Sequence, residues 1–268
     1  MTTTKFDTTE TKKEKKNSCR LSFLKGGIEN LENFLVYTNA TKKVLFSEKK
    51  RKYYVPNTSY GFDKLFSEGN SKLDKSILVF SMLPVVTCLN CKECKGSCYA
   101  RKAVNQYDNT WNKRLIVSYM AINHLELLEK WIREELSKTK KKYVRIHESG
   151  DFLSVEYALM WERIIKDFPK IDFYFYTKME IFPKFKTVIE RIHSLSNGNR
   201  CNSFLPNGGL NYGSIEYILD AYNNFHFPVC SYGMTKEEKA LFGIKKNLIC
   251  GKNCFICIKQ EHVLIKEH

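Results

Sequence analysis

The sequence lacks several features that would place it in a familiar class. No run of 18 apolar residues occurs, so we expect no membrane-spanning helix and no membrane partner. The N-terminus, MTTTKFDTTETKKEKK, has no apolar core of the kind found in secretory signal peptides. We therefore expect a cytoplasmic, intracellular protein whose cysteine thiols are kept reduced.

Motifs for frequent chemistries are also missing. The chain has no glycine-rich loop that would hold phosphates, and nothing in it suggests a Ser/His/Asp nucleophile set. No internal repeat of fixed period is visible. The ten cysteines are the strongest remaining signal, because grouped cysteines in a reducing compartment are more often metal ligands than disulfides.

Positive charge is abundant. The formal net charge is +15, with basic stretches at 42–52 and 138–145. Such charge favours a nucleic acid or nucleotide as substrate or partner. A coding bias toward lysine and asparagine would produce the same composition without that role, so both interpretations stay open.

The chain divides into four segments by composition. We expect a disordered basic tail at 1–17, an N-terminal segment of uncertain structure at 18–75, an α/β core at 76–229 and a cysteine-rich, metal-binding segment at 230–268. Within the core, apolar patterns predict alternating strands and helices. The expected strands are 76–83, 143–147, 171–178 and 201–205, and the expected helices are 109–138, 154–168, 182–195 and 213–223. This alternation is typical of βαβ units and a parallel sheet.

The first cysteine cluster has a spacing that is specific for metal. Residues 88–98 read CLNCKECKGSC, which is Cys-x2-Cys-x2-Cys-x3-Cys. Ferredoxins use this run for four-iron clusters, because two intervening residues let a loop wrap around the cubane. The predicted ligands are Cys88, Cys91, Cys94 and Cys98. A zinc site and unliganded thiols remain as alternatives.

A second cluster lies near the C-terminus. Residues 250–257 read CGKNCFIC, which places Cys250, Cys254 and Cys257 close together, and Cys230 is a candidate fourth ligand. Iron–sulfur and zinc are about equally favoured for this group. Cys19 and Cys201 are isolated and are interpreted as ordinary thiols.

Polar residues follow two of the expected strands. RIHESGD (145–151) and TK (177–178) stand where ligands bind in parallel α/β folds, at the carboxyl ends of strands. The candidate catalytic residues are His147, Glu148, Asp151 and Lys178, and the candidate cofactor-binding residues are Arg145, Ser149, Gly150 and Thr177. The alternative is structural, with an Arg145–Asp151 pair and a buried His147.

These residues resemble a known family. GNSKLDKSILVFSMLPVVTC with the later CYA (69–100), and VRIHESGDFLSVEYALMWERIIKDFPKIDFYFYTKM (144–179), are similar to the phage "gene product 88" family. The resemblance covers about 69–257 and implies a phage or mobile-element origin. It implies little about activity.

A looser likeness is to radical S-adenosylmethionine barrels. The order of SILVFSMLPVVTC, HESGD and YTK resembles the cysteine loop, the second-strand segment and the third-strand segment of those enzymes. The cysteine spacing differs, and HESGD stands where those barrels have a G-G-E-P segment. This likeness implies S-adenosylmethionine as a cofactor beside the cluster.

Together these observations predict an α/β protein with a partial (β/α) barrel-like parallel sheet, a cysteine-rich loop and a cysteine-rich C-terminal appendage. The leading hypothesis is an iron–sulfur metalloenzyme with one or two [4Fe–4S] clusters and radical S-adenosylmethionine-like redox chemistry on an unknown substrate. The alternatives are a zinc-stabilised nucleic-acid-binding protein and a non-catalytic phage factor that binds a host target.

Overall fold

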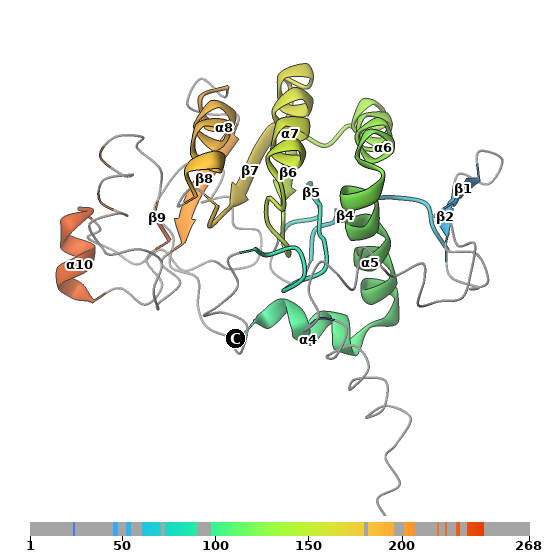
Figure 1. Ribbon diagram of the computed structural model, residues 1–268, viewed down its shortest axis with the longest axis horizontal. Coiled ribbons are helices and arrows are strands. Elements are labelled where there is room, and N and C mark those ends of the chain that lie inside the picture. The colour runs from blue at the N-terminus through green and yellow to red at the C-terminus, as the bar shows by residue number, and fades with distance from the viewer. Residues whose placement is uncertain are drawn as a thin grey trace, which may run out of the picture.

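The protein is a mixed α/β structure centred on a six-stranded sheet with the strand order β4-β5-β6-β7-β8-β9 (Figure 1). The computed structural model describes residues 24, 45–47, 52–54, 61–70, 73–89, 98–179, 182–195, 201–206, 219, 223, 229–230 and 235–243. A second sheet is antiparallel and joins β1 (Leu45–Ser47), β2 (Lys52–Tyr54) and β3 (Gly61–Phe62).

The strands of the main sheet follow one another in chain order. They are β4 (Ser67–Glu68), β5 (Ile77–Val79), β6 (Tyr143–Ile146), β7 (Asp172–Tyr176), β8 (Cys201–Pro206) and β9 (Val229–Cys230). Only β4 runs antiparallel to its neighbour, and β5 to β9 are parallel. This order has no switch point of the doubly wound kind. It is the order of a singly wound sheet, which is open between β4 and β9.

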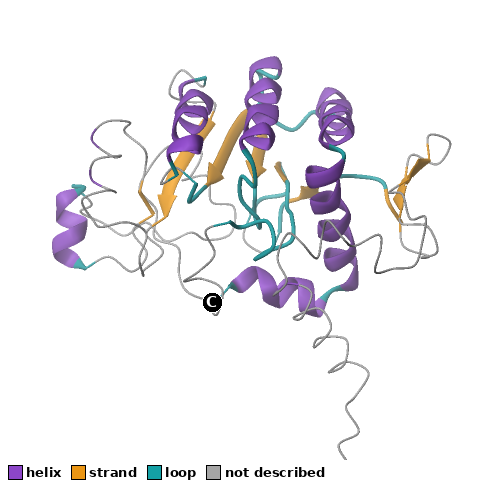
Figure 2. Ribbon diagram, in the orientation of Figure 1, coloured by secondary structure: helices purple, strands orange, loops and turns teal. Residues whose placement is uncertain are grey.

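The longer helices of the crossovers, between residues 108 and 194, cover one face of this sheet (Figures 1 and 2). The described helices are α4 (Tyr99–Gln106), α5 (Asp108–Asn123), α6 (Leu125–Lys138), α7 (Val155–Asp167), α8 (Pro183–Ser194) and α10 (Lys236–Leu241). Right-handed crossovers between neighbouring parallel strands place successive helices on the same face. No described helix is long and apolar enough to cross a membrane.

Alternate strand residues form the core beneath the helices. Leu78, Val144, Ile146, Phe173 and Phe175 are buried and pack with apolar side chains from α5, α6, α7 and α8. The alternation follows from strand geometry, in which successive side chains point to opposite faces. Burial of this one large cluster holds the helical layer on the sheet.

Local sequence signals set the helix ends. The Ser154 hydroxyl accepts a hydrogen bond from the Tyr157 N–H at 3.1 Å and caps α7. The helix ends at Asp167, just before Pro169, and Pro183 opens α8, where a missing N–H costs nothing. The helices expected at 154–168 and 182–195 are confirmed.

The helix expected over 109–138 is two helices rather than one. His124 leaves the helical region, with φ −143° and ψ 51°, and separates α5 from α6. α5 is buried on most of its surface from Trp111 to Ala121, whereas α6 buries a single stripe. The periodic pattern continues across the break, which is why the sequence suggested one element.

Several expectations concern parts of the chain outside the described residues. These include the tail at 1–17, most of the helix expected at 213–223, and most of the segment 230–268. In the segment of uncertain structure, 18–75, strands β1 to β3 form the small sheet and β4 joins the main one.

Candidate functional site

The carboxyl ends of β5, β6 and β7 bring the predicted site segments to one edge of the sheet. The arrowheads of β7 and β8 point toward the side on which α4 lies (Figure 1). The segment after β5 leads to Cys88, the segment after β6 is HESGD, and Thr177 and Lys178 follow β7. We call this edge the carboxyl edge.

The segments after β5 and β6 continue to pair beyond the strands. The Phe80 N–H donates to the Arg145 carbonyl at 3.0 Å, and the Glu148 N–H donates to the Phe80 carbonyl at 3.0 Å. The Met82 N–H then donates to the Ser149 carbonyl at 2.8 Å, and the Ser149 hydroxyl donates back to the Met82 carbonyl. Ser149 is therefore occupied in joining the two segments.

Gly150 allows these segments to come close. Its φ of +92° lies in the left-handed region, and a Cβ there would lie 2.7 Å from the Thr87 Oγ1 and 2.9 Å from the Met82 Cβ. The next residue, Asp151, donates its N–H to the Thr87 carbonyl at 3.2 Å. Because Thr87 immediately precedes Cys88, this contact places the start of the first cysteine cluster beside HESGD.

Asp151 connects the β6 segment with the β7 segment. Its Oδ1 accepts from the Phe152 N–H at 2.8 Å, and its Oδ2 accepts from the Lys178 N–H at 2.9 Å. Burial raises the pKa of Asp151 to about 6, although hydrogen bonds from the Thr177 side chain and these two N–H groups act in the opposite direction. The carboxyl group therefore joins the β6 and β7 segments, and the Asp151 N–H joins the β6 segment to the one after β5.

His147 points into the core beneath α7. It is 3% exposed, its Nε2 lies 2.9 Å from the Tyr157 hydroxyl, and its ring stacks on that ring and meets Phe152 edge-on. Burial, together with the positive charge of Arg145, lowers the pKa of His147 to about 3. The imidazole is neutral at pH 7 and occupies a structural position. Its catalytic role stays a prediction.

Glu148 turns the other way and meets a buried arginine. Arg114 on α5 forms an ion pair with its carboxylate, and the Ser81 hydroxyl donates to the same oxygen at 3.2 Å. Arg114 is 8% exposed. Sequence reasoning missed Arg114 and Ser81. The available signal was an arginine three residues after Trp111, on the buried side of an apolar helix.

Arg145 and the residues after β7 complete the edge. Arg145 lies on the sheet face opposite the helices, and its guanidinium lies 5.2 Å from the centre of the Tyr176 ring. Thr177 is fully buried, and its hydroxyl accepts from the Met179 N–H at 3.1 Å. Lys178 is half-buried. The structure thus brings all eight predicted catalytic and cofactor-binding residues to the carboxyl edge, in different orientations.

Two of the eight predicted metal-binding cysteines have described side chains. Cys88 and Cys98 are half-buried, and neither is in a disulfide. Cys98 stands at the N-cap of α4, where the helix dipole favours a thiolate. The segment before Cys88 is anchored, because Leu83 and Val86 pack against Val104.

The other predicted ligands cannot be placed by contacts. Cys91, Cys94, Cys250, Cys254 and Cys257 lie outside the described residues, and only the backbone of Cys230 is described, at the end of β9. Within the described part of the chain, no three metal-binding side chains gather. The metal centres therefore stay predictions.

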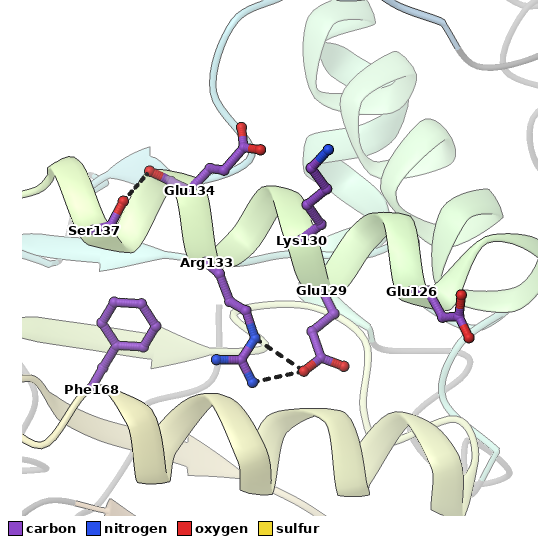
Figure 3. A pocket seen from close by; sticks show the side chains of 7 residues that line it. All are labelled: Glu126, Glu129, Lys130, Arg133, Glu134, Ser137 and Phe168. Carbon is purple, nitrogen blue, oxygen red and sulfur yellow. Dashed lines mark hydrogen bonds and ion pairs between the residues drawn. The ribbon is translucent and has the colours of Figure 1, made fainter.

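A hollow of about 590 Å³ lies away from this edge, on the outer helices (Figure 3). It is lined by Glu126, Glu129, Lys130, Arg133, Glu134, Ser137 and Phe168. Arg133 crosses it and binds the Glu129 carboxylate at 2.7 Å. The hollow is open, and the Arg133 guanidinium that crosses it is already paired with Glu129, so we place the candidate site at the carboxyl edge instead.

Comparison with known proteins gives a family match. A family model described as "Gene product 88" matches residues 61–201, which run from β3 to the start of β8 and include the whole carboxyl edge up to Lys178. The "Gene 88 protein" of Mycobacterium phage D29 is 34% identical over 55 residues, and that of Mycobacterium phage L5 is 33% identical over 55 residues. Each match covers 20% of this chain and 23% of the relative. No solved structure matches.

Proposed function

We propose that this chain, which belongs to the gene product 88 family, is an iron–sulfur metalloenzyme with its active site at the carboxyl edge of the main sheet. The observation that carries the proposal is the convergence of three strand ends. Hydrogen bonds from Asp151 to Thr87 and from Lys178 to Asp151 tie the cysteine loop to the two polar segments. Ligands of parallel α/β folds bind at this edge.

The strand order supports a partial (β/α) barrel. Five parallel strands in chain order, with the crossover helices on one face, are arranged as in a barrel that has not closed. The opposite face would line the interior of such a barrel. Arg145, stacked on Tyr176, lies on that face and is a suitable group for the carboxylate of S-adenosylmethionine.

The donor set fits a cluster. Cys88 and Cys98 are half-buried, form no disulfide and stand at the two ends of a loop that also contains Cys91 and Cys94. A four-iron cluster, once bound, supplies single electrons at low potential. The lysines at 92 and 95 add positive charge that favours thiolates in this loop.

The polar residues divide into two roles in this proposal. Ser149, Gly150 and Asp151 are positioning residues, because their polar or backbone groups are engaged in joining the three segments. Glu148 and Lys178 are the groups that would bind the substrate. The Arg114 ion pair fixes the orientation of the Glu148 carboxylate.

The test is metal analysis of anaerobically purified protein. We expect a brown protein with acid-labile sulfide and about four or eight iron atoms per chain. The Cys88→Ser/Cys98→Ser double variant should lose about four iron atoms, whereas the Cys19→Ser/Cys201→Ser double variant, which changes the two isolated cysteines, should retain them.

A colourless protein with one or two zinc ions and no sulfide would contradict the iron–sulfur proposal and favour a zinc-stabilised fold. If the iron–sulfur protein is obtained, incubation with S-adenosylmethionine and a reductant should yield 5′-deoxyadenosine. Absence of this product from the reduced, fully loaded protein would contradict the radical chemistry but not the presence of the cluster.

A further inference from the structure

Lysines gather at the other edge of the sheet, where the parallel strands begin. Lys75 precedes β5, a run from residue 138 to 142 precedes β6, and Lys170 precedes β7. The set that we call the lysine rim comprises Lys75, Lys138, Lys140, Lys141, Lys142 and Lys170. Because parallel strands start at the same edge, these three segments are neighbours in space.

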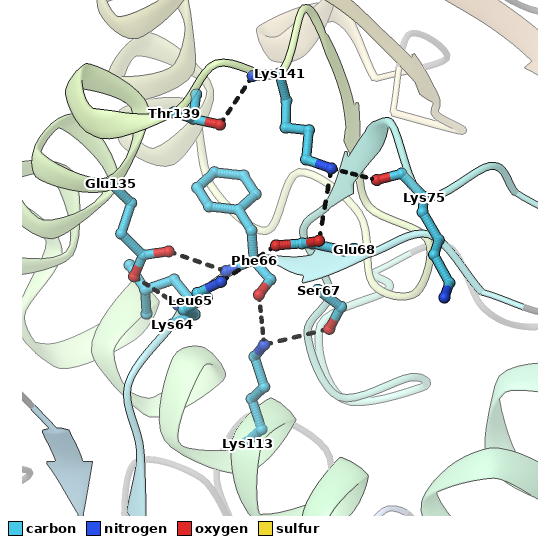
Figure 4. Close-up of polar contacts among 10 residues, drawn as sticks. All are labelled: Lys64, Leu65, Phe66, Ser67, Glu68, Lys75, Lys113, Glu135, Thr139 and Lys141. Atoms are coloured by element: carbon cyan, nitrogen blue, oxygen red, sulfur yellow. Dashed lines mark hydrogen bonds and ion pairs between the residues drawn. The ribbon is translucent and has the colours of Figure 1, made fainter.

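Hydrogen bonds hold the three segments side by side. The Lys141 ammonium donates to the Lys75 carbonyl at 2.9 Å and lies 3.5 Å from the Glu68 carboxylate (Figure 4). The Asp172 N–H donates to the Lys142 carbonyl at 2.7 Å, which brings the start of β7 against the same run. The Lys141 side chain thus has a structural role in the rim, because it joins the segment before β6 to the segment before β5.

The other five lysines of the rim are exposed and keep their charge available. Among the residues that the structure describes, none of them forms an ion pair. Two nearby carboxylates are engaged elsewhere, since Asp74 accepts from the Ser76 N–H at 2.7 Å and Asp167 binds Arg133 at 2.5 Å. On the helical face, in contrast, Lys166 is paired with Glu162 at 2.9 Å.

The partner that suits this surface is a polymer of regularly spaced anions. Neighbouring strands are about 4.8 Å apart, so the three segments present ammonium groups across about 10 Å. Lysine is a point charge without the planar fork that reads base edges. Such a row is suited to phosphates, whose contacts position a nucleic acid without reading its sequence.

We propose that the lysine rim binds the sugar-phosphate backbone of a nucleic acid. The rim lies at the opposite edge of the sheet from the cysteine loop and HESGD, so this surface does not depend on the metal centre or on catalysis. It would hold a nucleic acid at the edge where the parallel strands begin, and the carboxyl edge would remain accessible to a substrate.

The experiment measures binding of fluorescein-labelled single-stranded and double-stranded oligonucleotides, DNA and RNA, by anisotropy at several salt concentrations. The rim variant is Lys140→Glu/Lys142→Glu/Lys170→Glu, which leaves Lys141 and its contacts intact. The control, Lys102→Glu/Lys130→Glu/Lys236→Glu, makes the same change in net charge at exposed lysines on α4, α6 and α10. Equal thermal stability of the three proteins shows that each is folded.

We expect the rim variant to bind at least about tenfold more weakly than the wild type, and the slope of log Kd against log salt to fall by about two to three. The control should stay within about twofold of the wild type. Equal losses in both variants would overturn the proposal, because binding would then follow net charge alone. Absence of wild-type binding would overturn it too, as would displacement of the oligonucleotide by phosphatidylserine vesicles but not by unlabelled oligonucleotide.

Discussion

Two residues with left-handed backbone shape the loop after β6. His147 has a φ of +62° and Gly150 a φ of +92°. Glycine adopts this region without cost, whereas histidine is strained there by on the order of 1 kcal/mol. Strand alternation would otherwise send residue 147 to the face opposite the helices, with Arg145. The left-handed turn reverses this, and the ring packs under α7 on Tyr157.

An added side chain has no room at Gly150. Gly150→Ala introduces a Cβ within 3 Å of Thr87 and Met82 in addition to backbone strain. We expect a loss of about 2–4 kcal/mol in the free energy of unfolding, measured by urea denaturation. Gly243→Ala is the matched control, because Gly243 has a φ of +65° but nothing within 4 Å of the added Cβ. The control should lose only about 1 kcal/mol. Equal losses of stability in the two variants would show that the close contacts of Gly150 with Thr87 and Met82 are not the cause.

His147 and Asp151 give opposite pH dependences. The folded state resists protonation of His147 until about pH 3, whereas the unfolded chain binds that proton near pH 6.5, so acidification through this range destabilises the fold. Asp151 titrates near pH 6 when folded and near 3.8 when unfolded, so acidification between these values stabilises the fold. The two effects oppose each other between about pH 4 and 6.

Variants separate these effects. Relative to the wild type, His147→Asn should gain stability on acidification from pH 6 to pH 4, and Asp151→Asn should lose it, each by up to about 1.4 kcal/mol per pH unit. Asparagine is chosen at 147 because it tolerates the left-handed region. Urea denaturation at pH 4, 5, 6 and 7 measures the slopes. Curves for both variants that run parallel to the wild type would show that neither group titrates as inferred.

At the scale of elements, α6 holds the antiparallel edge of the main sheet. The Glu135 carboxylate accepts the N–H groups of Leu65 and Phe66, at 2.6 and 3.3 Å, just before β4 (Figure 4). Lys113 on α5 donates to the Phe66 carbonyl at 3.0 Å from the other side. Burial lowers the pKa of Lys113 to about 8, and the attraction of Glu135 acts in the opposite direction.

Removal of this carboxylate should release the edge strand. Glu135→Ala leaves two N–H groups without their acceptor, and we expect a loss of about 1–3 kcal/mol in the free energy of unfolding. Hydrogen exchange should also become faster at Ser67 and Glu68 than at β6. Glu134→Ala, one position earlier on α6, is the control and should change stability by less than about 0.5 kcal/mol. Unchanged exchange in β4 would show that β4 does not depend on the carboxylate.

At the scale of the whole molecule, metal binding should couple to folding. A ligand that binds only the folded chain raises its stability by mass action. We expect the loaded protein to have a Tm at least about 5 °C above that of the metal-free protein, measured by circular dichroism. In the Cys88→Ser/Cys98→Ser double variant this difference should shrink. Equal Tm values before and after removal of the metal would argue against a structural contribution of the centre.

The order of the core elements from β5 to β8, apart from the short helix α4, was readable from the sequence, because local patterns specify them. Ser154 and Pro169 mark the ends of α7, and the apolar run before Pro84 marks β5. The sequence also predicted that HESGD and TK lie at the same edge of the sheet, since the carboxyl ends of parallel strands lie together. The break at His124 did not follow, because apolar spacing continues through it.

Only the tertiary structure decided which way the site residues face. Strand periodicity places Arg145, but a single left-handed residue turns His147 inward, and no local pattern marks that backbone angle. Glu148 receives Arg114 from 34 residues earlier in the chain, and the lysine rim forms because three separate segments start neighbouring strands. The sequence by itself determined the core strands, their order and the groups available for chemistry. Long-range packing determined which of those groups are buried, paired or left exposed.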